Sequence, residues 1–205
     1  MSAMILASVV CLAYLIGSIP TGLIAGRLKG VDVRQHGSGN VGATNVARVV
    51  GKLPGGIVLL VDAAKGWLPV TLLASKAAQL GAGIPVDALR IVLGVAAVAG
   101  HIWNPFLQFQ GGKGVATALG VLLGLDGRVA AAVFAVWLAA AFFTRYVSVA
   151  SLCAALAAPF VMLFLGDSTP WVLGAIGVSL AIVWRHRPNI LRLLHREEHR
   201  IGRKS

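Results

Sequence analysis

Long apolar runs separated by short polar segments dominate the 205-residue chain. A membrane-spanning helix needs roughly 20 mostly apolar residues. Seven runs approach that length, at residues 3–25, 55–75, 86–103, 114–125, 129–144, 148–165 and 170–184. The fourth is short, so we expect a tilted or half-inserted helix beside a loop that protein covers. The pattern predicts an all-α membrane protein with seven transmembrane helices in a single domain, residues 1–205.

The composition supports a membrane location. Hydrophobic residues make up 58% of the chain and charged residues only 12%, whereas soluble domains carry about twice that share of charge. There are 18 Lys and Arg against 7 Asp and Glu, a formal net charge of +11. The basic residues lie between apolar runs, and not on soluble elements with interleaved aromatics as nucleic-acid binding requires. We therefore expect contact with membrane lipid and no nucleic-acid partner.

The basic residues also predict the orientation. Fourteen of the 18 fall in alternate segments, namely 26–54, 104–113, the turn at Arg145 and the tail 185–205. By the positive-inside rule these segments face the cytoplasm, which places the N-terminus outside and the C-terminus inside, as seven spans require. The first run exceeds a signal-peptide core in length and is expected to be retained. We expect a multi-pass protein of the cell inner membrane, whose basic tail lies on anionic lipid.

A glycine-rich polar segment follows the first run, from His36 to Arg48. Its glycines, among them Gly37 and Gly39, let the backbone approach an anion, and Arg48 offers a bidentate hydrogen-bond donor suited to phosphate. Hydrogen-bonding side chains lie between them: Ser38, Asn40, Thr44 and Asn45. The alternative is a polar loop with ordinary turn glycines. The density of small and amide residues before a spaced arginine favours a phosphate-binding loop.

A second glycine-rich segment opens the fourth run. It contains Gly111, Gly112, Lys113, Gly114 and Thr117. A glycine turn that leads into a helix N-terminus presents unpaired N–H groups and the positive end of the helix dipole. The segment therefore predicts an anion site, with a flexible hinge as the alternative. It is not a Walker A loop, because G-x-x-x-x-G-K-[ST] is absent.

A third polar segment follows the last run. A basic flank that stops translocation of the chain across the membrane would by itself explain the arginines of this segment. It would not require the other polar side chains, so the segment supplies four candidates for substrate contact: His186, Asn189, Arg192 and Glu198.

Other polar residues within the apolar runs are interpreted as structural. Asp62 and Lys65 lie three residues apart, on one helix face, and are expected to pair; the alternative is that Lys65 joins the anion site. His101 is expected to be a satisfied interface residue. Cys11 and Cys153 have neither disulfide nor metal-site spacing and are expected in the core. The sequence contains no His-x4-Asp motif and no metal-ligand cluster.

These three segments, together with Gly17-Ser18-Ile19-Pro20, closely resemble the bacterial acyl-phosphate:glycerol-3-phosphate acyltransferase family. The resemblance runs almost end to end. It implies seven spans and transfer of a fatty acyl group from acyl phosphate to the 1-hydroxyl of sn-glycerol 3-phosphate. The products are 1-acyl-sn-glycerol 3-phosphate (lysophosphatidate) and phosphate, in phospholipid biosynthesis. No cofactor or metal is implied, and a soluble enzyme that makes acyl phosphate is a candidate partner.

The resemblance also implies roles for individual residues. The catalytic set that it implies is Ser38, Arg48, Lys113, His186 and Asn189. The remaining candidates are expected to bind substrate: Gly37, Gly39, Asn40, Thr44, Asn45, Gly111, Gly112, Gly114, Thr117, Arg192 and Glu198. Two positions depart from the family pattern, since Arg196 replaces a usual glycine and Gln110 an often-found lysine.

Acyl phosphate is an activated mixed anhydride, so the enzyme mainly has to hold two anions and stabilise charge. The resemblance suggests a substrate phosphate as the base, with His186 as the alternative. Two other functions compete. An organophosphate carrier would place its site at the midplane between repeated halves, which the chain lacks. A non-catalytic lipid scaffold would not require such specific polar residues.

Overall fold

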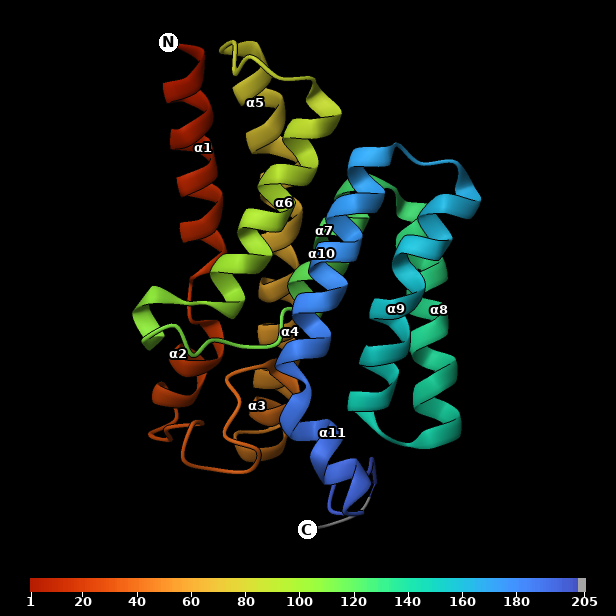
Figure 1. The fold of residues 1–205 in the computed structure, drawn as a ribbon. Coiled ribbons are helices and arrows are strands. Elements are labelled where there is room, and N and C mark those ends of the chain that lie inside the picture. The colour runs from red at the N-terminus through yellow and green to blue at the C-terminus, as the bar shows by residue number, and fades with distance from the viewer. Residues whose placement is uncertain (203–205) are drawn as a thin grey trace. The chain divides into compact units, whose positions relative to one another are not determined.

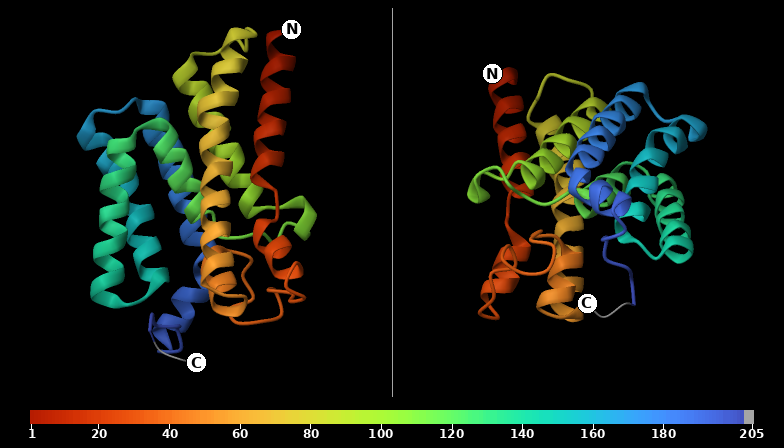
Figure 2. Two further views of the ribbon diagram at one scale, coloured as in Figure 1. Left: turned by 180° about the vertical axis from the view of Figure 1, so that it is seen from behind. Right: turned by 60° about the horizontal axis from the view of Figure 1, so that its bottom comes forward.

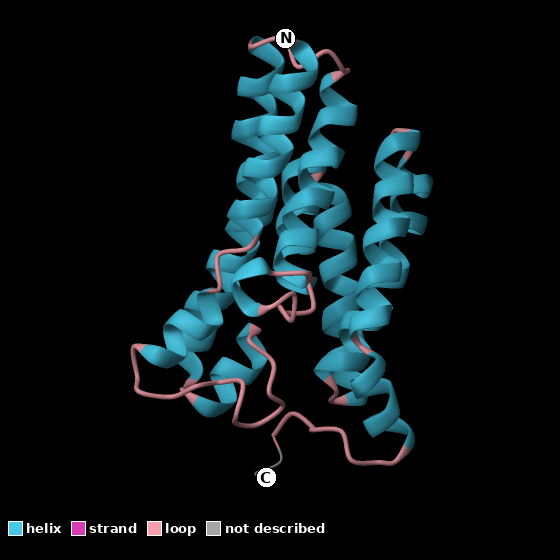
Figure 3. Ribbon diagram, turned by 60° about the vertical axis from the view of Figure 1, so that its left-hand side comes forward, coloured by secondary structure: helices cyan, strands magenta, loops and turns pink. Residues whose placement is uncertain are grey.

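The computed structural model describes residues 1–202, and within that range the chain forms helices and no strands (Figure 1, Figure 3). The all-α prediction is therefore confirmed. Contacts divide the chain into two compact units, Met1–Leu125 and Asp126–Ser205. The single domain over 1–205 stays a prediction. Arg203 and Lys204, counted above in the basic tail, lie outside the described residues.

The first unit contains seven α-helices and two short helices of other types among its described residues. They are α1 (Ser2–Gly17), α2 (Thr21–Arg27), α3 (Ala43–Val49), α4 (Lys52–Leu68), the π-helical η1 (Pro69–Leu73), α5 (Ala74–Gln79), α6 (Val86–Ile102), the 3-10 turn η2 (Pro105–Leu107) and α7 (Val115–Leu125). The second unit contains α8 (Gly127–Thr144), α9 (Val147–Leu165), α10 (Thr169–Arg185) and α11 (Arg187–Leu194).

Five helical segments are long and apolar enough to cross a membrane: Ser2–Arg27, Lys52–Gln79, Val86–Leu107, Gly127–Thr144 and Val147–Leu165. Two further apolar helices, Val115–Leu125 and Thr169–Arg185, are shorter. These seven segments correspond to the seven predicted runs, and the short fourth run is α7. The count of seven spans and the orientation of the termini stay predictions.

The chain interrupts its first predicted run at Pro20, between α1 and α2. Proline has no backbone N–H and cannot continue the helical hydrogen-bond ladder. The break leaves the carbonyls of Ser18 and Ile19 without a helical donor, although Ile19 O accepts from Thr21 N at 2.9 Å. In apolar surroundings such carbonyls also draw side-chain donors. Asn104 Nδ2 donates to Ser18 O at 2.5 Å, and Lys65 Nζ donates to Ile19 O at 2.8 Å. The broken helix is therefore fixed to two other elements of the first unit.

Helices α4 and α7 approach each other closely because glycines form their contact. A Cβ atom built on Gly66 would lie 2.0 Å from Thr117 O, and one on Gly120 would lie 1.8 Å from Ala63 O. Side chains at these positions would force the helices apart. The short helix α7 is thus seated directly on the backbone of α4, which sets where its N-terminus lies.

In the second unit, α8 and α9 run side by side as a helical hairpin (Figure 2). Ser179 Oγ donates to Ala155 O at 2.5 Å and links α10 to α9. Cys153 on α9 is exposed, as is Cys11 on α1. Their predicted place in the core is wrong, because both lie on outward faces of helices for which lipid would supply the apolar surroundings.

Candidate active site

The first glycine-rich segment is a loop followed by α3, and the Asn45 side chain organises it. Asn45 is buried; its Nδ2 donates to Val33 O at 2.9 Å and to His36 O at 3.1 Å. Its Oδ1 accepts from Ser38 N at 2.9 Å and from Arg48 Nη1 at 3.4 Å. These contacts use both donors and both acceptor positions of the amide. They indicate that Asn45 shapes the loop, and its predicted contact with substrate stays a prediction.

The glycines of this loop provide backbone angles that other residues rarely adopt. Gly37 and Gly39 have φ of +61° and +68°, where glycine has no steric cost. Between them Ser38 is half-buried, while Arg48 on α3 is exposed. The loop therefore presents the serine from a turn, and Asn45 Oδ1 links the backbone of that serine to the Arg48 side chain.

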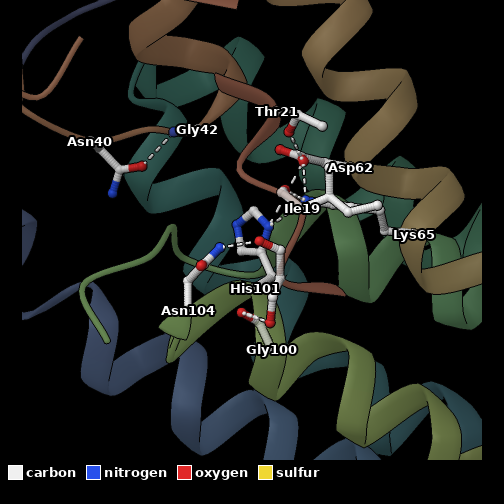
Figure 4. Close-up of polar contacts among 10 residues, drawn as sticks. Ile19, Thr21, Asn40, Gly42, Asp62, Lys65, Gly100, His101 and Asn104 are labelled. Carbon is white, nitrogen blue, oxygen red and sulfur yellow. Dashed lines mark hydrogen bonds and ion pairs between the residues drawn. The ribbon is translucent and has the colours of Figure 1, made fainter. Parts of the chain in front are cut away.

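Two local contacts complete the loop. Asn40 Oδ1 accepts from Gly42 N at 2.7 Å (Figure 4), and Thr44 is exposed in the first turn of α3. Arg34 forms a 2.6 Å ion pair with Asp32. The hydrogen bond from Arg34 lowers the pKa of the Asp32 carboxyl to about 2. The pair therefore stays ionised near neutral pH, and the charge of Arg34 is compensated within the loop.

The second glycine-rich segment packs against the C-terminal end of α6. Gly111 N donates to Ile102 O at 3.0 Å and Gly112 N donates to His101 O at 3.1 Å. A Cβ on Gly111 would lie 2.0 Å from His101 O, and one on Gly112 would lie 2.1 Å from His101 Nε2. Close packing on His101 therefore requires both glycines. Their N–H groups are used within the protein, which corrects the expectation that they are open donors.

The features suited to an anion lie slightly later, around the start of α7. Lys113 is half-buried and Gly114 has φ +83°. Helix α7 begins at Val115, and N–H groups of a first helical turn have no partner within the helix and lie at its positive end. Thr117 is fully buried, and its hydroxyl has no hydrogen-bond partner among the described residues.

In the second unit, His186 lies between α10 and α11 and Asn189 lies in the first turns of α11; both are buried. His186 Nδ1 is 2.8 Å from Ile182 O. A carbonyl only accepts, so Nδ1 carries a proton and the neutral ring has its lone pair on Nε2. Asn189 Oδ1 has no partner in the described part of the chain. It is a buried acceptor that a ligand hydroxyl could satisfy.

Glu198 holds this second group of side chains together. Asn189 Nδ2 donates to its Oε1 and Arg192 Nε to its Oε2, each at 2.8 Å. Burial raises the pKa of Glu198, but the hydrogen bonds from Asn189 and Arg192 outweigh it, so its pKa lies below the usual range. The carboxylate therefore orients Asn189 and compensates Arg192, whose Nε is already used.

The departure from the family pattern at residue 196 has a structural counterpart. Arg196 has φ +62°, in the left-handed region where glycine carries no steric penalty. The turn before Glu198 thus retains the backbone shape that a glycine would favour, with an arginine in its place.

A buried polar cluster contains residues that the sequence analysis missed or treated as structural. The predicted Asp62–Lys65 pair is confirmed, with Nζ 2.7 Å from Oδ1. Thr21 Oγ1 donates to Asp62, and Lys65 also contacts His101 (Figure 4). Thr21 was missed because a threonine directly after a proline is an ordinary residue for the start of a helix. His101 is a satisfied buried residue, as expected.

A family model described as glycerol-3-phosphate acyltransferase matches residues 7–196. Among curated relatives, a glycerol-3-phosphate acyltransferase from a Synechococcus species is 46% identical and aligns over 98% of this chain and 99% of its own. The relative from Moorella thermoacetica, glycerol-3-phosphate acyltransferase 2, is 46% identical over 94% of this chain and 96% of its own. The chain belongs to the glycerol-3-phosphate acyltransferase family.

Two crystal structures of the integral membrane glycerol 3-phosphate acyltransferase PlsY share the fold. The glycerol 3-phosphate form is 43% identical with a TM-score of 0.88, and the alignment covers 96% of both chains. The lysophosphatidic acid form is 42% identical with a TM-score of 0.86, covering 96% of this chain and 95% of the other. Membership of this family confirms the resemblance seen in the three motifs. It places the chain among the membrane-integral acyltransferases of phospholipid biosynthesis.

Proposed function

We propose that this chain transfers a fatty acyl group from acyl phosphate to the 1-hydroxyl of sn-glycerol 3-phosphate, giving lysophosphatidate and phosphate. The observation that carries the proposal is the 43% identity, over 96% of both chains, to PlsY in its glycerol 3-phosphate form. The choice of acyl phosphate as donor rests on the phosphate-suited residues and on the lack of a His-x4-Asp motif in the sequence. A mixed anhydride needs no covalent nucleophile on the enzyme.

The reaction requires two anions to be held beside each other. The glycerol hydroxyl oxygen attacks the acyl carbonyl carbon, the bond from that carbon to the phosphate oxygen breaks, and phosphate leaves with the bonding electrons. Negative charge grows on the carbonyl oxygen and on the leaving phosphate. Arg48, Lys113 and the first-turn N–H groups of α7 are of the right kind to stabilise that charge. We assign phosphate binding to these groups and a hydrogen-bonding role to the Ser38 hydroxyl.

His186 and Asn189 supply polar groups of another kind. Asn189 Oδ1 is suited to accept a hydrogen bond from a glycerol hydroxyl. His186 has its Nδ1 proton directed to Ile182 O at 2.8 Å, so we assign any contact with substrate to Nε2, as an acceptor or, when protonated, as a cationic donor. We assign the attacking hydroxyl's proton to a substrate phosphate. The competing assignment is His186 Nε2 as the base.

The location of the reaction follows from the charge pattern and stays a prediction. The three polar segments fall in the alternate stretches that the positive-inside rule assigns to the cytoplasm. We place the reaction at the cytoplasmic face of the inner membrane, where a soluble enzyme could deliver acyl phosphate. The acyl chain would then lie among the apolar helices.

The decisive experiment uses the purified protein in lipid with palmitoyl phosphate as donor. Phosphate should be released only when glycerol 3-phosphate is present, and lysophosphatidate should appear in equal amount. Arg48→Ala and Lys113→Ala should each abolish turnover, while Lys29→Ala, which removes an exposed lysine outside both glycine-rich segments, should not. Use of palmitoyl-CoA and not palmitoyl phosphate would overturn the donor assignment.

A second experiment separates the two candidate bases. Glycerol 3-phosphonate has a different acid dissociation from glycerol 3-phosphate, so it should shift the pH–rate profile if the substrate group takes the proton. His186→Gln should then lower the rate without moving that profile. The histidine is the base if two results are obtained. The pH–rate profile must be the same with the phosphonate, and the fall in rate at low pH must disappear in His186→Gln.

A further inference from the structure

The break between α1 and α2 meets α4 and α6 in a buried polar cluster that the proposed reaction does not use. It consists of the side chains of Thr21, Asp62, Lys65 and His101 with the carbonyl of Ile19 (Figure 4). Asp62 is 1% exposed, Lys65 3% and His101 7%. Ionised side chains in such surroundings are costly and usually have a function or a specific partner.

The Lys65 ammonium is fully occupied within this cluster. Its Nζ lies 2.7 Å from Asp62 Oδ1, 2.8 Å from Ile19 O and 3.4 Å from His101 Nδ1. An ammonium group has three N–H donors, and these three acceptors account for all of them. Lys65 therefore has no donor left for a substrate phosphate, which argues against the alternative that it joins the anion site.

The same contacts determine the protonation of His101. An ammonium group has no lone pair, so it can only donate to His101 Nδ1, and that nitrogen must accept. The imidazole proton then lies on Nε2. Asp62 Oδ1 lies 3.8 Å from His101 Nδ1 and 2.7 Å from Lys65 Nζ, so with a protonated His101 one buried carboxylate would have to compensate two positive charges. His101 is therefore neutral, with a defined tautomer.

The opposite edge of the His101 ring faces the second glycine-rich segment. Its Nε2 would lie 2.1 Å from a Cβ on Gly112. Its backbone carbonyl accepts from Gly112 N at 3.1 Å and would lie 2.0 Å from a Cβ on Gly111. The ring and the backbone of this residue thus form the surface on which the chain before Lys113 rests.

The cluster also reaches the first glycine-rich segment, through α2. Thr21 donates to Asp62 at 2.5 Å. Its neighbour Gly22 packs so closely that a Cβ there would lie 1.7 Å from Val41 O. A shift of Asp62 would consequently be transmitted to α2 and to the backbone that follows Asn40.

We propose that the Asp62–Lys65 pair is a positioning device for the acyl-transfer reaction: it holds His101 as the Nε2–H tautomer, and His101 sets the backbone of Gly111–Lys113. Asp62, Lys65 and His101 are positioning residues in this account, since none of them is assigned to touch substrate. The proposal rests on the proposed function, because it assumes that Lys113 binds a substrate phosphate.

The test separates positioning from charge compensation. Lys65→Met and Asp62→Asn each leave one buried partner uncompensated, and both should lower the thermal midpoint as well as activity. The double variant Asp62→Asn with Lys65→Met removes both charges and should recover the midpoint. Because its His101 is no longer fixed, kcat/KM for palmitoyl phosphate should stay roughly 10- to 100-fold below wild type, the scale of an ångström-sized misplacement. Thr71→Val, a half-buried position in the same helical segment, Lys52–Gln79, is the matched control and should keep wild-type kinetics.

A spectroscopic measurement tests the tautomer independently. In protein labelled with ¹⁵N-histidine and reconstituted in lipid, the His101 signals, identified by their loss in His101→Asn, should show a protonated Nε2 and an unprotonated Nδ1. The double variant should lose that preference. The proposal is overturned if wild-type His101 is protonated on Nδ1, or if the double variant keeps wild-type kcat/KM. Failure of the wild type to use palmitoyl phosphate would instead overturn the proposed function.

Discussion

The two glycine-rich segments of the first unit look alike in sequence but need their glycines for different reasons. In the first, Gly37 and Gly39 have positive φ and lie exposed in a loop. In the second, Gly111 and Gly112 are buried and would clash with His101 if they carried a Cβ. Gly39 mainly supplies a backbone angle that other residues rarely adopt, and Gly37 supplies both such an angle and space, because a Cβ there would lie 2.4 Å from Asn45 Oδ1. In the second segment, Gly111 and Gly112 supply space, and only the following Gly114 has a positive φ.

The difference shows how each loop is held in place. A single amide side chain, Asn45, organises the first loop from within. The second loop is held from outside, by the end of α6 and the buried cluster behind it. A substitution in the first loop should therefore act locally, whereas one in the second should shift a whole segment against a rigid neighbour.

The largest effect should follow from adding a methyl group to the second loop. In Gly112→Ala the Cβ meets a buried ring fixed by Lys65, so the backbone before Lys113 must move. We expect kcat/KM for palmitoyl phosphate to fall at least about 100-fold, since misplacement by about 1 Å costs that much. Gly56→Ala, which has nothing within 4 Å of the new Cβ, should keep wild-type kinetics in the same assay. Equal activities would contradict the space requirement.

Removal of the organising amide should have the next largest effect. Asn45→Ala leaves Val33 O and the N–H of Ser38 without their partner, while His36 O keeps the hydrogen bond from Gly39 N. Orphaned buried groups cost about 1–3 kcal/mol each, so a chemical-unfolding curve should show a clear loss, and activity should fall at least about tenfold. Asn40→Ala loses one contact, to Gly42 N, and serves as the milder comparison. Similar losses in both variants would show that Asn45 has no special place in the loop.

Two glycine substitutions compare the effect of an unfavourable positive φ inside and outside the first glycine-rich segment. Gly39 and Gly30 have nearly equal φ, +68° and +70°. Alanine at either should cost about 1–2 kcal/mol of stability. Only Gly39→Ala should also reduce turnover, about tenfold, because Gly39 adjoins Ser38. Steady-state rates of the two variants at matched folded fractions decide the point, and equal rates would remove Gly39 from the site.

The third polar segment contrasts with the first because a carboxylate, and not an amide, organises it. The pKa of Glu198 is lowered from its ordinary 4.5, so its stabilising contribution is complete above that pH and is lost as the pH falls through the lowered pKa. The thermal midpoint of the wild type should therefore drop on acidification from about pH 6 to about pH 3. Glu198→Gln should start lower and lose less over that range. Parallel curves would exclude this role.

The smallest effect should be a gain. Arg196 has φ +62° without being glycine, so Arg196→Gly should raise the free energy of unfolding by about 1 kcal/mol, the cost of a left-handed residue less the extra freedom of an unfolded glycine. Arg196→Ala keeps the unfavourable angle and should show no gain. A denaturant titration followed by tryptophan fluorescence measures both.

The apolar runs and the three polar segments were predictable because each depends on short stretches of chain. Lipid demands about 20 apolar residues per span, and phosphate chemistry demands glycine, arginine and lysine close together. The break at Pro20 inside the first run was missed, although the proline was visible. Its cost depends on whether distant residues, here Asn104 and Lys65, can serve the freed carbonyls.

The sequence by itself determined the helices, their apolar faces and the residue types available for binding anions. The tertiary structure decided which of those groups are already used. Asn45, a candidate for binding substrate, has its hydrogen-bonding capacity filled by its own loop, and Lys65 has its three donors filled by α4, α6 and the broken helix. The physical reason is that each polar group has a fixed number of hydrogen bonds, and buried groups find partners from segments far apart in the chain. Only folding shows which capacity remains for a substrate.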